Sequence, residues 1–136
     1  MEKGAYRGIA ALQLVTGAGL ILFWTAFFTI GLAPQNPPPG YFVFEHSFPL
    51  PDVLLAFLLF GAAALLGSHD EKRCRVGRNL SLVAAGGLLF LGVLDFSFNI
   101  QNGMYTTSMV DGIGAGFIQL WCVGAGLIMI RSCRIR

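Results

Sequence analysis

The sequence predicts an all-α fold, a transmembrane four-helix bundle whose N and C termini are both cytoplasmic. The first observation behind this prediction is the composition: 55% of the 136 residues are hydrophobic, 12% are charged, and the mean hydropathy is +0.70. Soluble domains carry about twice that share of charged residues. The second observation is that the apolar residues gather in four long runs, and the third is that the basic residues avoid these runs. We therefore expect the lipid bilayer to be the solvent of this chain.

The first expected helix covers residues 8–33, an uncharged run long enough to cross a hydrocarbon core of about 30 Å. Lys3 and Arg7 precede it, as basic residues precede the apolar part of a secretory signal peptide. The run is much longer than that apolar part and lacks a small-x-small cleavage site near its end, so we expect a retained span. Residues 34–40, PQNPPPG, form a loop because proline lacks an amide donor and clashes with the preceding helical turn.

The second expected helix starts at Pro49-Leu50-Pro51-Asp52, where proline is tolerated and an acid lies near the positive end of the helix dipole. Residues 68–78, SHDEKRCRVGR, are expected to form a charged loop. The helices are expected at about residues 8–33, 50–67, 79–100 and 111–130. No loop is long enough for a soluble catalytic module, so we expect a single domain over residues 1–136.

The basic residues predict the orientation. All nine Lys and Arg residues lie before the first run, between the second and third runs, or after the fourth. Four spans put these three places on one face, and an excess of Lys and Arg marks the cytoplasmic side. The chain is therefore expected to be a multi-pass protein of the plasma membrane, the inner membrane of a bacterium.

Charge and cysteine content exclude other classes. The net charge of +2 is too small to indicate binding to nucleic acid. The three cysteines show no paired spacing and no metal-ligand spacing, so we interpret them as reduced thiols. We therefore expect no metal site, and no cofactor can be named.

A short aromatic and acidic segment, Tyr41 to Asp52, lies between the first two runs and is the main candidate site. It contains Glu45, His46 and Asp52, while the expected outer side of the membrane holds no Lys or Arg. Carboxylates without a basic partner suit a divalent cation, a proton or an organic cation. In the alternative interpretation Asp52 and Asp111 cap the second and fourth helices and Glu45 is solvated.

Asp95 is the one ionisable residue in the third expected span, residues 79–100. A carboxylate at this depth costs roughly 1 to 3 kcal/mol unless it is paired, hydrated or protonated. Asn99, four residues later, shares its helix face. We expect Asp95 to point toward Glu45, His46 or Tyr41, either in a structural hydrogen-bond network or in a ligand or proton site.

His46 and two glycines complete the candidates. One His cannot make a zinc site, so a hydrogen bond from His46 to an outer carboxylate is the expected use, and it would make the site sensitive to pH. The nearby aromatic residues are expected to form an interfacial belt, or else to hold a quaternary ammonium group.

Gly112 and Gly116 form a small-x-x-x-small pair, expected to let a helix of this chain or of another subunit approach closely.

Two short motifs carry a resemblance: F-E-x-S-F-P-x-x-D at Phe44 to Asp52 and L-D-F-x-x-N at Leu94 to Asn99. In a four-span chain of this length they resemble small uncharacterised bacterial integral membrane proteins. The resemblance covers the topology and these motifs and brings no activity. It implies that Glu45, Asp52, Asp95 and Asn99 belong to one constellation.

Three functions remain open from the sequence. The leading expectation is a non-catalytic accessory or assembly subunit of a larger membrane complex, because the loops are short and the helices are rich in glycine. The second is a binding or transport module for a cation, proton or cationic amphiphile. The third is an enzyme acting on a lipid or quinone with Glu45 and His46 as acid and base, which the scattered acids support least.

Overall fold

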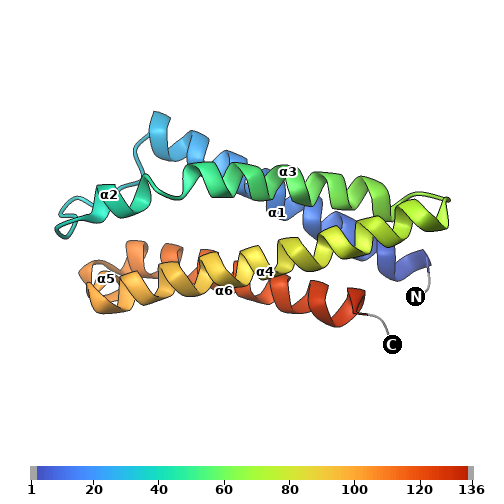
Figure 1. Cartoon of the computed structure of the whole chain (residues 1–136). Helices are drawn as coiled ribbons and strands as arrows, with labels where there is room; N and C mark the ends of the chain where they lie inside the picture. Colours follow the sequence, from blue (N-terminus) through green and yellow to red (C-terminus); the bar gives the residue numbers. More distant parts are fainter. Residues whose placement is uncertain (1–2, 135–136) are drawn as a thin grey trace. The chain divides into compact units, whose positions relative to one another are not determined.

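The structure is a computed structural model, and it describes residues 3–134. These residues form helices and no strand, which confirms the predicted all-α class. The helices, labelled in Figure 1, are α1 (Lys3–Thr29), α2 (Tyr41–Glu45), α3 (Pro49–Leu66), α4 (Glu71–Gln101), α5 (Met104–Thr107) and α6 (Met109–Cys133). Four stretches are long and apolar enough to cross a membrane: Tyr6–Thr29, Tyr41–Leu66, Glu71–Gln101 and Met109–Cys133.

Glycines fix the end of α1 and the start of α2. α1 ends at Thr29, four residues before the predicted end, because Gly31 has a φ of 83°. The Gly31 amide donates to the Ala26 carbonyl at 3.2 Å, as at many helix ends. Gly40, with a φ of 80°, is the N-cap residue of α2 and joins the proline-rich loop to it. The sequence did not predict this short helix.

The prediction of a charged loop over residues 68–78 is wrong for most of that segment, because α4 already begins at Glu71. Asp70 starts the helix: its Oδ1 accepts the backbone N–H of Lys72 at 3.0 Å, and Glu71 occupies the first turn. A dense run of charge is compatible with a loop, but Glu, Lys and Arg are also good helix formers.

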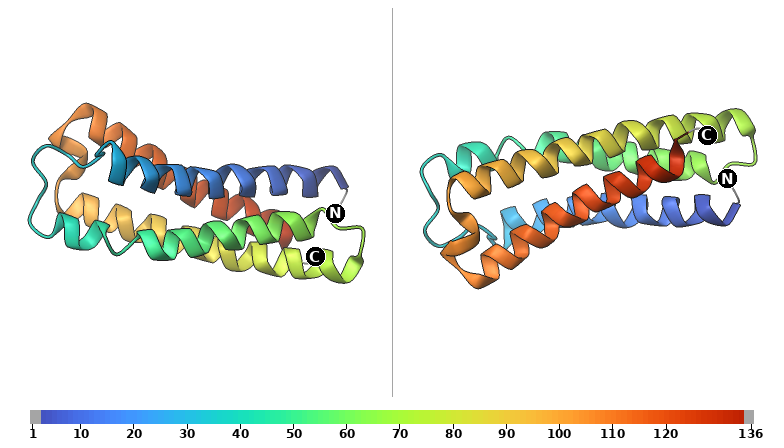
Figure 2. Two further views of the ribbon diagram at one scale, coloured as in Figure 1. Left: turned by 90° about the horizontal axis from the view of Figure 1, so that it is seen from above. Right: turned by 90° about the horizontal axis from the view of Figure 1, so that it is seen from below.

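The described chain forms two compact units, and the boundary between them lies within α4, between Ser81 and Leu82. In the first unit α1 and α3 run antiparallel, as Figure 2 shows. They approach closely at Gly17, where an added Cβ would lie 2.6 Å from the Phe60 ring. The buried core of this unit includes Ile9, Trp24, Phe27, Leu55, Ala56, Leu59, Ala62 and Leu66.

Polar side chains join α1 to the first part of α4. The buried Gln13 Nε2 donates to Ser81 Oγ at 2.6 Å. Ser81 Oγ in turn donates to the Gly77 carbonyl at 2.7 Å. Hydrogen bonds of this kind hold membrane helices together where lipid offers no competing partner.

The second unit consists of α4 from Leu82 onward, α5 and α6. A Cβ on Gly126 of α6 would lie 3.0 Å from the Ala85 carbonyl oxygen of α4. The two helices are therefore almost in backbone contact there. Small side chains make this approach possible, and Ala84, Ala85, Leu88, Ala125 and Met129 are buried in this unit.

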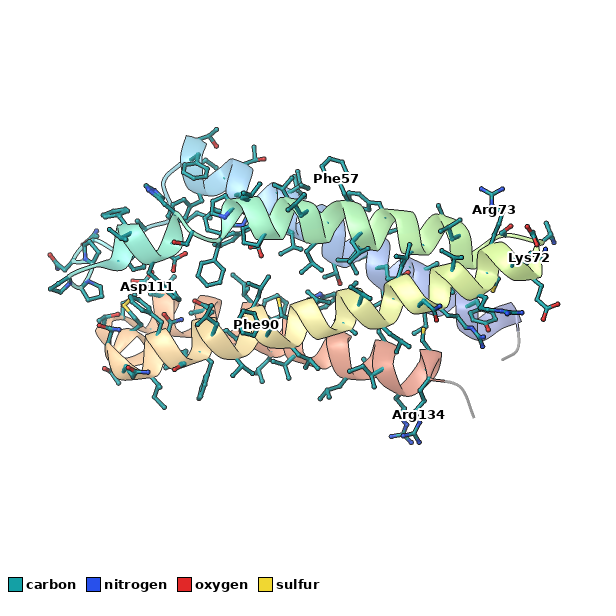
Figure 3. The ribbon with its side chains drawn as sticks, viewed as in Figure 1. Phe57, Lys72, Arg73, Phe90, Asp111 and Arg134 are labelled. Carbon is teal, nitrogen blue, oxygen red and sulfur yellow. The ribbon has the colours of Figure 1, made fainter. Side chains whose placement is uncertain are left out.

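Large apolar side chains cover much of the outside of both units. Phe57 is 65% exposed and Phe90 68% exposed (Figure 3). Leu22 and Leu120 are 67% and 75% exposed. Such a surface is stable against lipid and not against water.

Candidate functional site

The second unit holds four linked polar side chains, here termed the Asp95 site: Asp95 and Asn99 of α4, Tyr105 of α5 and Gln119 of α6. Gln119 Nε2 donates to Asp95 Oδ2 at 2.6 Å. The Tyr105 hydroxyl donates to Gln119 Oε1, and Tyr105 also hydrogen bonds with the Asn99 side chain. Asn99 and Gln119 are buried, whereas Asp95 and Tyr105 are half-buried. One amide thus connects the carboxyl group of one helix with the phenol of another.

A glycine on α4 brings Gln119 within reach of Asp95. Gly92 lies about one turn before Asp95, and a Cβ there would lie 3.1 Å from Val123 Cγ2 and 3.6 Å from the Gln119 carbonyl oxygen. Because Gly92 has no side chain, α4 and α6 can lie close together next to the Asp95 site. A side chain larger than that of alanine at position 92 would press against Val123 and the Gln119 backbone.

The turn after α4 positions Tyr105. Gly103 has a φ of 65°, which reverses the chain after the end of α4. Ser108 is the N-cap of α6, and its Oγ accepts the Asp111 amide at 3.0 Å. A Cβ on Gly112 would lie 2.6 Å from the Tyr105 carbonyl oxygen, so only glycine allows α5 to lie this close to α6.

The environment of Tyr105 favours its protonated form. Burial is the largest effect and raises the pKa of Tyr105 above its usual value of 10.0. The Asn99 hydrogen bond lowers this pKa, the Asp95 carboxylate raises it, and the Gln119 hydrogen bond lowers it, with a net upward shift. At neutral pH Tyr105 is therefore a hydrogen-bond donor, which fixes the Gln119 amide with its NH₂ group toward Asp95.

No basic residue is available to Asp95 from its own unit's spans. The sequence has no Lys, Arg or His between Arg78 and Arg131. Arg131 lies in the last turn of α6, about three turns beyond Gln119. The partner of the carboxyl group in the structure is a neutral amide. Among residues 3–134, no three His, Cys, Asp or Glu side chains gather as a metal site would require.

In the first unit, Asp52 is buried and accepts a hydrogen bond from Trp24 Nε1 at 2.7 Å. Phe48, and not Asp52, occupies the N-cap position of α3, and Asp52 lies in the first turn. The interpretation of Asp52 as the capping residue is therefore wrong. Its side chain joins α3 to α1, while its position still favours a negative charge at the helix N-terminus.

The other predicted residues of the first unit lie on or next to α2. Tyr41 is buried, Glu45 is half-buried, and the two are four residues apart on one face of the helix. His46 is exposed, and its ring lies among three aromatic rings, with centroid distances of 6.4 Å to Phe27, 5.7 Å to Phe28 and 5.9 Å to Phe42. The hydrogen bond expected between His46 and a carboxylate stays a prediction.

The residues expected at the start of the fourth span take different roles. Ser108 caps α6, so Asp111 is not the cap as predicted and lies in the first turn (Figure 3). Gly112 does permit a close approach, but its neighbour is the backbone of Tyr105. At Gly116 an added Cβ would meet nothing within 4 Å. Packing of this glycine pair against a further helix stays a prediction.

The predicted constellation of Glu45, Asp52, Asp95 and Asn99 divides between the two units, and its assembly stays a prediction. Within the second unit, Asp95 and Asn99 each have a polar partner: Gln119 donates to Asp95, and Tyr105 hydrogen bonds with Asn99. Gln119 was missed, although it is the only amide side chain in the apolar run after Asp111. Its isolation in that run was the available signal, because a polar side chain in a span needs a partner.

These features define a multi-pass, all-helical membrane protein with polar side chains paired inside its helical units. Comparison with models of protein families, with curated proteins and with solved structures finds no match for the chain.

Proposed function

We propose that this chain is a plasma-membrane protein, in a bacterium an inner-membrane protein, that binds or transports a cation, with the Asp95 site as its binding site. The candidates are a small cation, a proton or a cationic amphiphile. The observation that carries the proposal is the hydrogen bond between Asp95 in α4 and the neutral amide of Gln119. An ionisable group in a span, held by neutral partners, is a functional site by default in membrane proteins.

The proposed orientation places both termini in the cytoplasm. Arg7 lies near the start of α1, Lys72 and Arg73 lie in the first turn of α4, and Arg131 lies in the last turn of α6. With four spans these places share one face, which the positive-inside rule makes cytoplasmic. Asp95 then lies toward the outer leaflet. A reporter that is fluorescent only in the cytoplasm, fused to the C terminus, tests this orientation. We expect the fusion to be fluorescent.

The polarity of the Asp95 site supports cation binding. The donors run from the Tyr105 hydroxyl to Gln119 and from the Gln119 amide to Asp95. Both hydrogen bonds therefore stabilise negative charge on the carboxyl group without neutralising it. A cation from outside the spans can supply the missing positive charge. Asp95 is half-buried, so part of its side chain is accessible to such a cation.

The test is cation binding and flux in liposomes reconstituted with the purified protein. We expect wild type to dissipate an imposed proton or sodium gradient, or to bind the cation, and Asp95→Asn to lose this activity. Asp111→Asn is the matched control, because Asp111 also lies in unit two but in the first turn of α6. If Asp95→Asn only lowers stability and leaves binding and flux unchanged, the site is structural and the proposal fails.

A second candidate function, an accessory or assembly subunit of a larger membrane complex, is favoured by the surface of α6. Added Cβ atoms at Gly114, Gly116 and Gly124 would meet nothing within 4 Å, so these positions leave room for a helix of another subunit or of a second copy. Native mass spectrometry of the protein extracted gently from its own membrane separates the two functions. Polypeptides that co-purify with both wild type and Asp95→Asn favour the subunit; a small ion or molecule lost in the variant favours the binding site.

A further inference from the structure

The first two turns of α4 form a basic extension, residues 71–78, that precedes the apolar part of the helix. It contains Lys72, Arg73, Arg75 and Arg78, of which the first three are exposed. The 31 residues of α4 span about 46 Å at about 1.5 Å per residue, while a hydrocarbon core is about 30 Å thick. Because the apolar part begins after Arg78, the extension is the part that exceeds the core. It therefore lies at the level of lipid headgroups.

The acids beside the extension are used at the start of the helix. Asp70 Oδ1 accepts the Lys72 amide at 3.0 Å, and Glu71 lies in the first turn. Both positions favour negative charge because the N-terminal end of the helix dipole is positive. The four basic side chains outnumber these two acids, so the extension keeps a net positive charge.

The packing of the extension turns basic side chains outward. A Cβ on Gly77 would lie 2.8 Å from the Leu66 amide nitrogen, so the Gly77 face of the extension lies against the end of α3. At about 100° per residue, Lys72 and Arg75 lie on the opposite face and project away from α3. Figure 3 shows Lys72 and Arg73 at this end of α4.

A basic residue of α1 lies at the same level. The hydrogen bond from Gln13 to Ser81 sets the register of α1 against residues 71–81 of α4. Within the first unit this part of α4 runs in the same direction as α1, because each is antiparallel to α3. Arg7 precedes Gln13 by as many residues as Arg75 precedes Ser81. The exposed Arg7 therefore adds to the positive charge of the extension.

We infer that the basic extension, together with Arg7, binds the phosphate headgroups of anionic phospholipids. Charge complementarity carries this inference: a cluster of four or more basic residues next to a membrane span attracts anionic lipid. Guanidinium groups bind phosphate oxygens in pairs, and the lysine ammonium adds a point charge. This surface lies in the first unit and is separate from the Asp95 site.

The test is lipid retention in native mass spectrometry after reconstitution into nanodiscs that contain equal amounts of phosphatidylglycerol and phosphatidylcholine. We expect wild type to retain phosphatidylglycerol preferentially. Each basic residue near an anionic surface is worth a factor of about five, so Lys72→Gln/Arg75→Gln should lower this preference by about tenfold or more. Glu71→Gln is the matched control, because it removes a negative charge from the same turn and should keep or raise the preference.

Equal retention of the two lipids by wild type, or an unchanged preference in the double variant, would overturn the inference. If the double variant does not fold, wild type at high salt replaces it, because salt screens exposed charges. A preference that persists unchanged in high salt then counts against headgroup binding. Arg75→Lys, which keeps the charge, should retain most of the preference.

Discussion

The carbonyl oxygen of Tyr105 lies 2.6 Å from the point where a side chain on Gly112 would begin. This contact holds α5 against α6 and brings the Tyr105 hydroxyl to Gln119, seven residues after Gly112 and on the same face of α6. Because Gly112 has no Cβ, the backbone of Tyr105 can lie against α6. The Tyr105 hydroxyl then reaches Gln119, about two helical turns after Gly112. Gly112 is a positioning residue for the Asp95 site.

Gly112→Ala should therefore break the hydrogen bond between Tyr105 and Gln119. The added methyl group meets backbone atoms, which cannot rotate away, and overpacking of this kind costs about 1–3 kcal/mol. We expect the free energy of unfolding in detergent to fall by that amount. Gly116→Ala is the matched control in the same helix, because its methyl group meets nothing within 4 Å. It should be neutral or stabilising by up to about 1 kcal/mol, and an equal loss in both variants would refute the positioning role.

Much of the fold could be predicted from the sequence because the hydropathy of a segment indicates whether it lies in lipid or in water. The four spans follow from apolar runs, and the end of α1 differs by only a few residues because glycine can end a helix before the apolar run ends. The start of α4 was missed for another reason. Lys and Arg serve equally well as loop residues and as helix formers, and only the Asp70 cap separates the two.

The Asp95 site could be predicted only in part. The spacing of Asp95 and Asn99 places them on one face because helix periodicity is local. Their partners Tyr105 and Gln119 depend on the turn at Gly103 and on close contacts of Gly92 and Gly112, which no periodicity records. The pairing of Trp24 with Asp52 was missed likewise, because it joins residues from two helices across a loop.

The alkaline limit of the Asp95 site should be set by Tyr105. Its folded-state pKa is raised, so it stabilises the fold below the unfolded value of 10.0 and this contribution is lost as the pH rises through the folded pKa. We expect wild type to lose stability relative to Tyr105→Phe only above about pH 10. Unfolding measured across this range, with tyrosinate absorbance recorded in parallel, tests the sign. A difference between the two proteins that does not change with alkaline pH would contradict it.

Loss of the Trp24 indole donor should destabilise the first unit through Asp52. Trp24→Phe keeps an aromatic ring in the core but removes the Nε1 donor at 2.7 Å from the buried carboxylate. Loss of one partner of a buried polar pair costs about 1–3 kcal/mol. Unfolding in detergent followed by circular dichroism measures this loss. The double variant Trp24→Phe/Asp52→Leu should recover part of it, and no recovery would assign the loss to ring packing alone.

The buried hydrogen bond between Gln13 and Ser81 should couple α1 to the first part of α4 more strongly than an exposed bond of the same chemistry couples its two residues. Gln13 Nε2 donates to Ser81 Oγ at 2.6 Å, and both residues are fully buried. A double-mutant cycle with Gln13→Ala and Ser81→Ala should give a coupling free energy of about 0.6–2 kcal/mol. The matched pair is Gln101 and Ser97, joined by the same amide-to-hydroxyl bond at 2.9 Å but exposed and within one helix. Its cycle should give less than about 0.5 kcal/mol. Equal coupling in the two cycles would mean that burial adds nothing, and that apolar packing, including Gly17 against Phe60, holds α1 in the first unit.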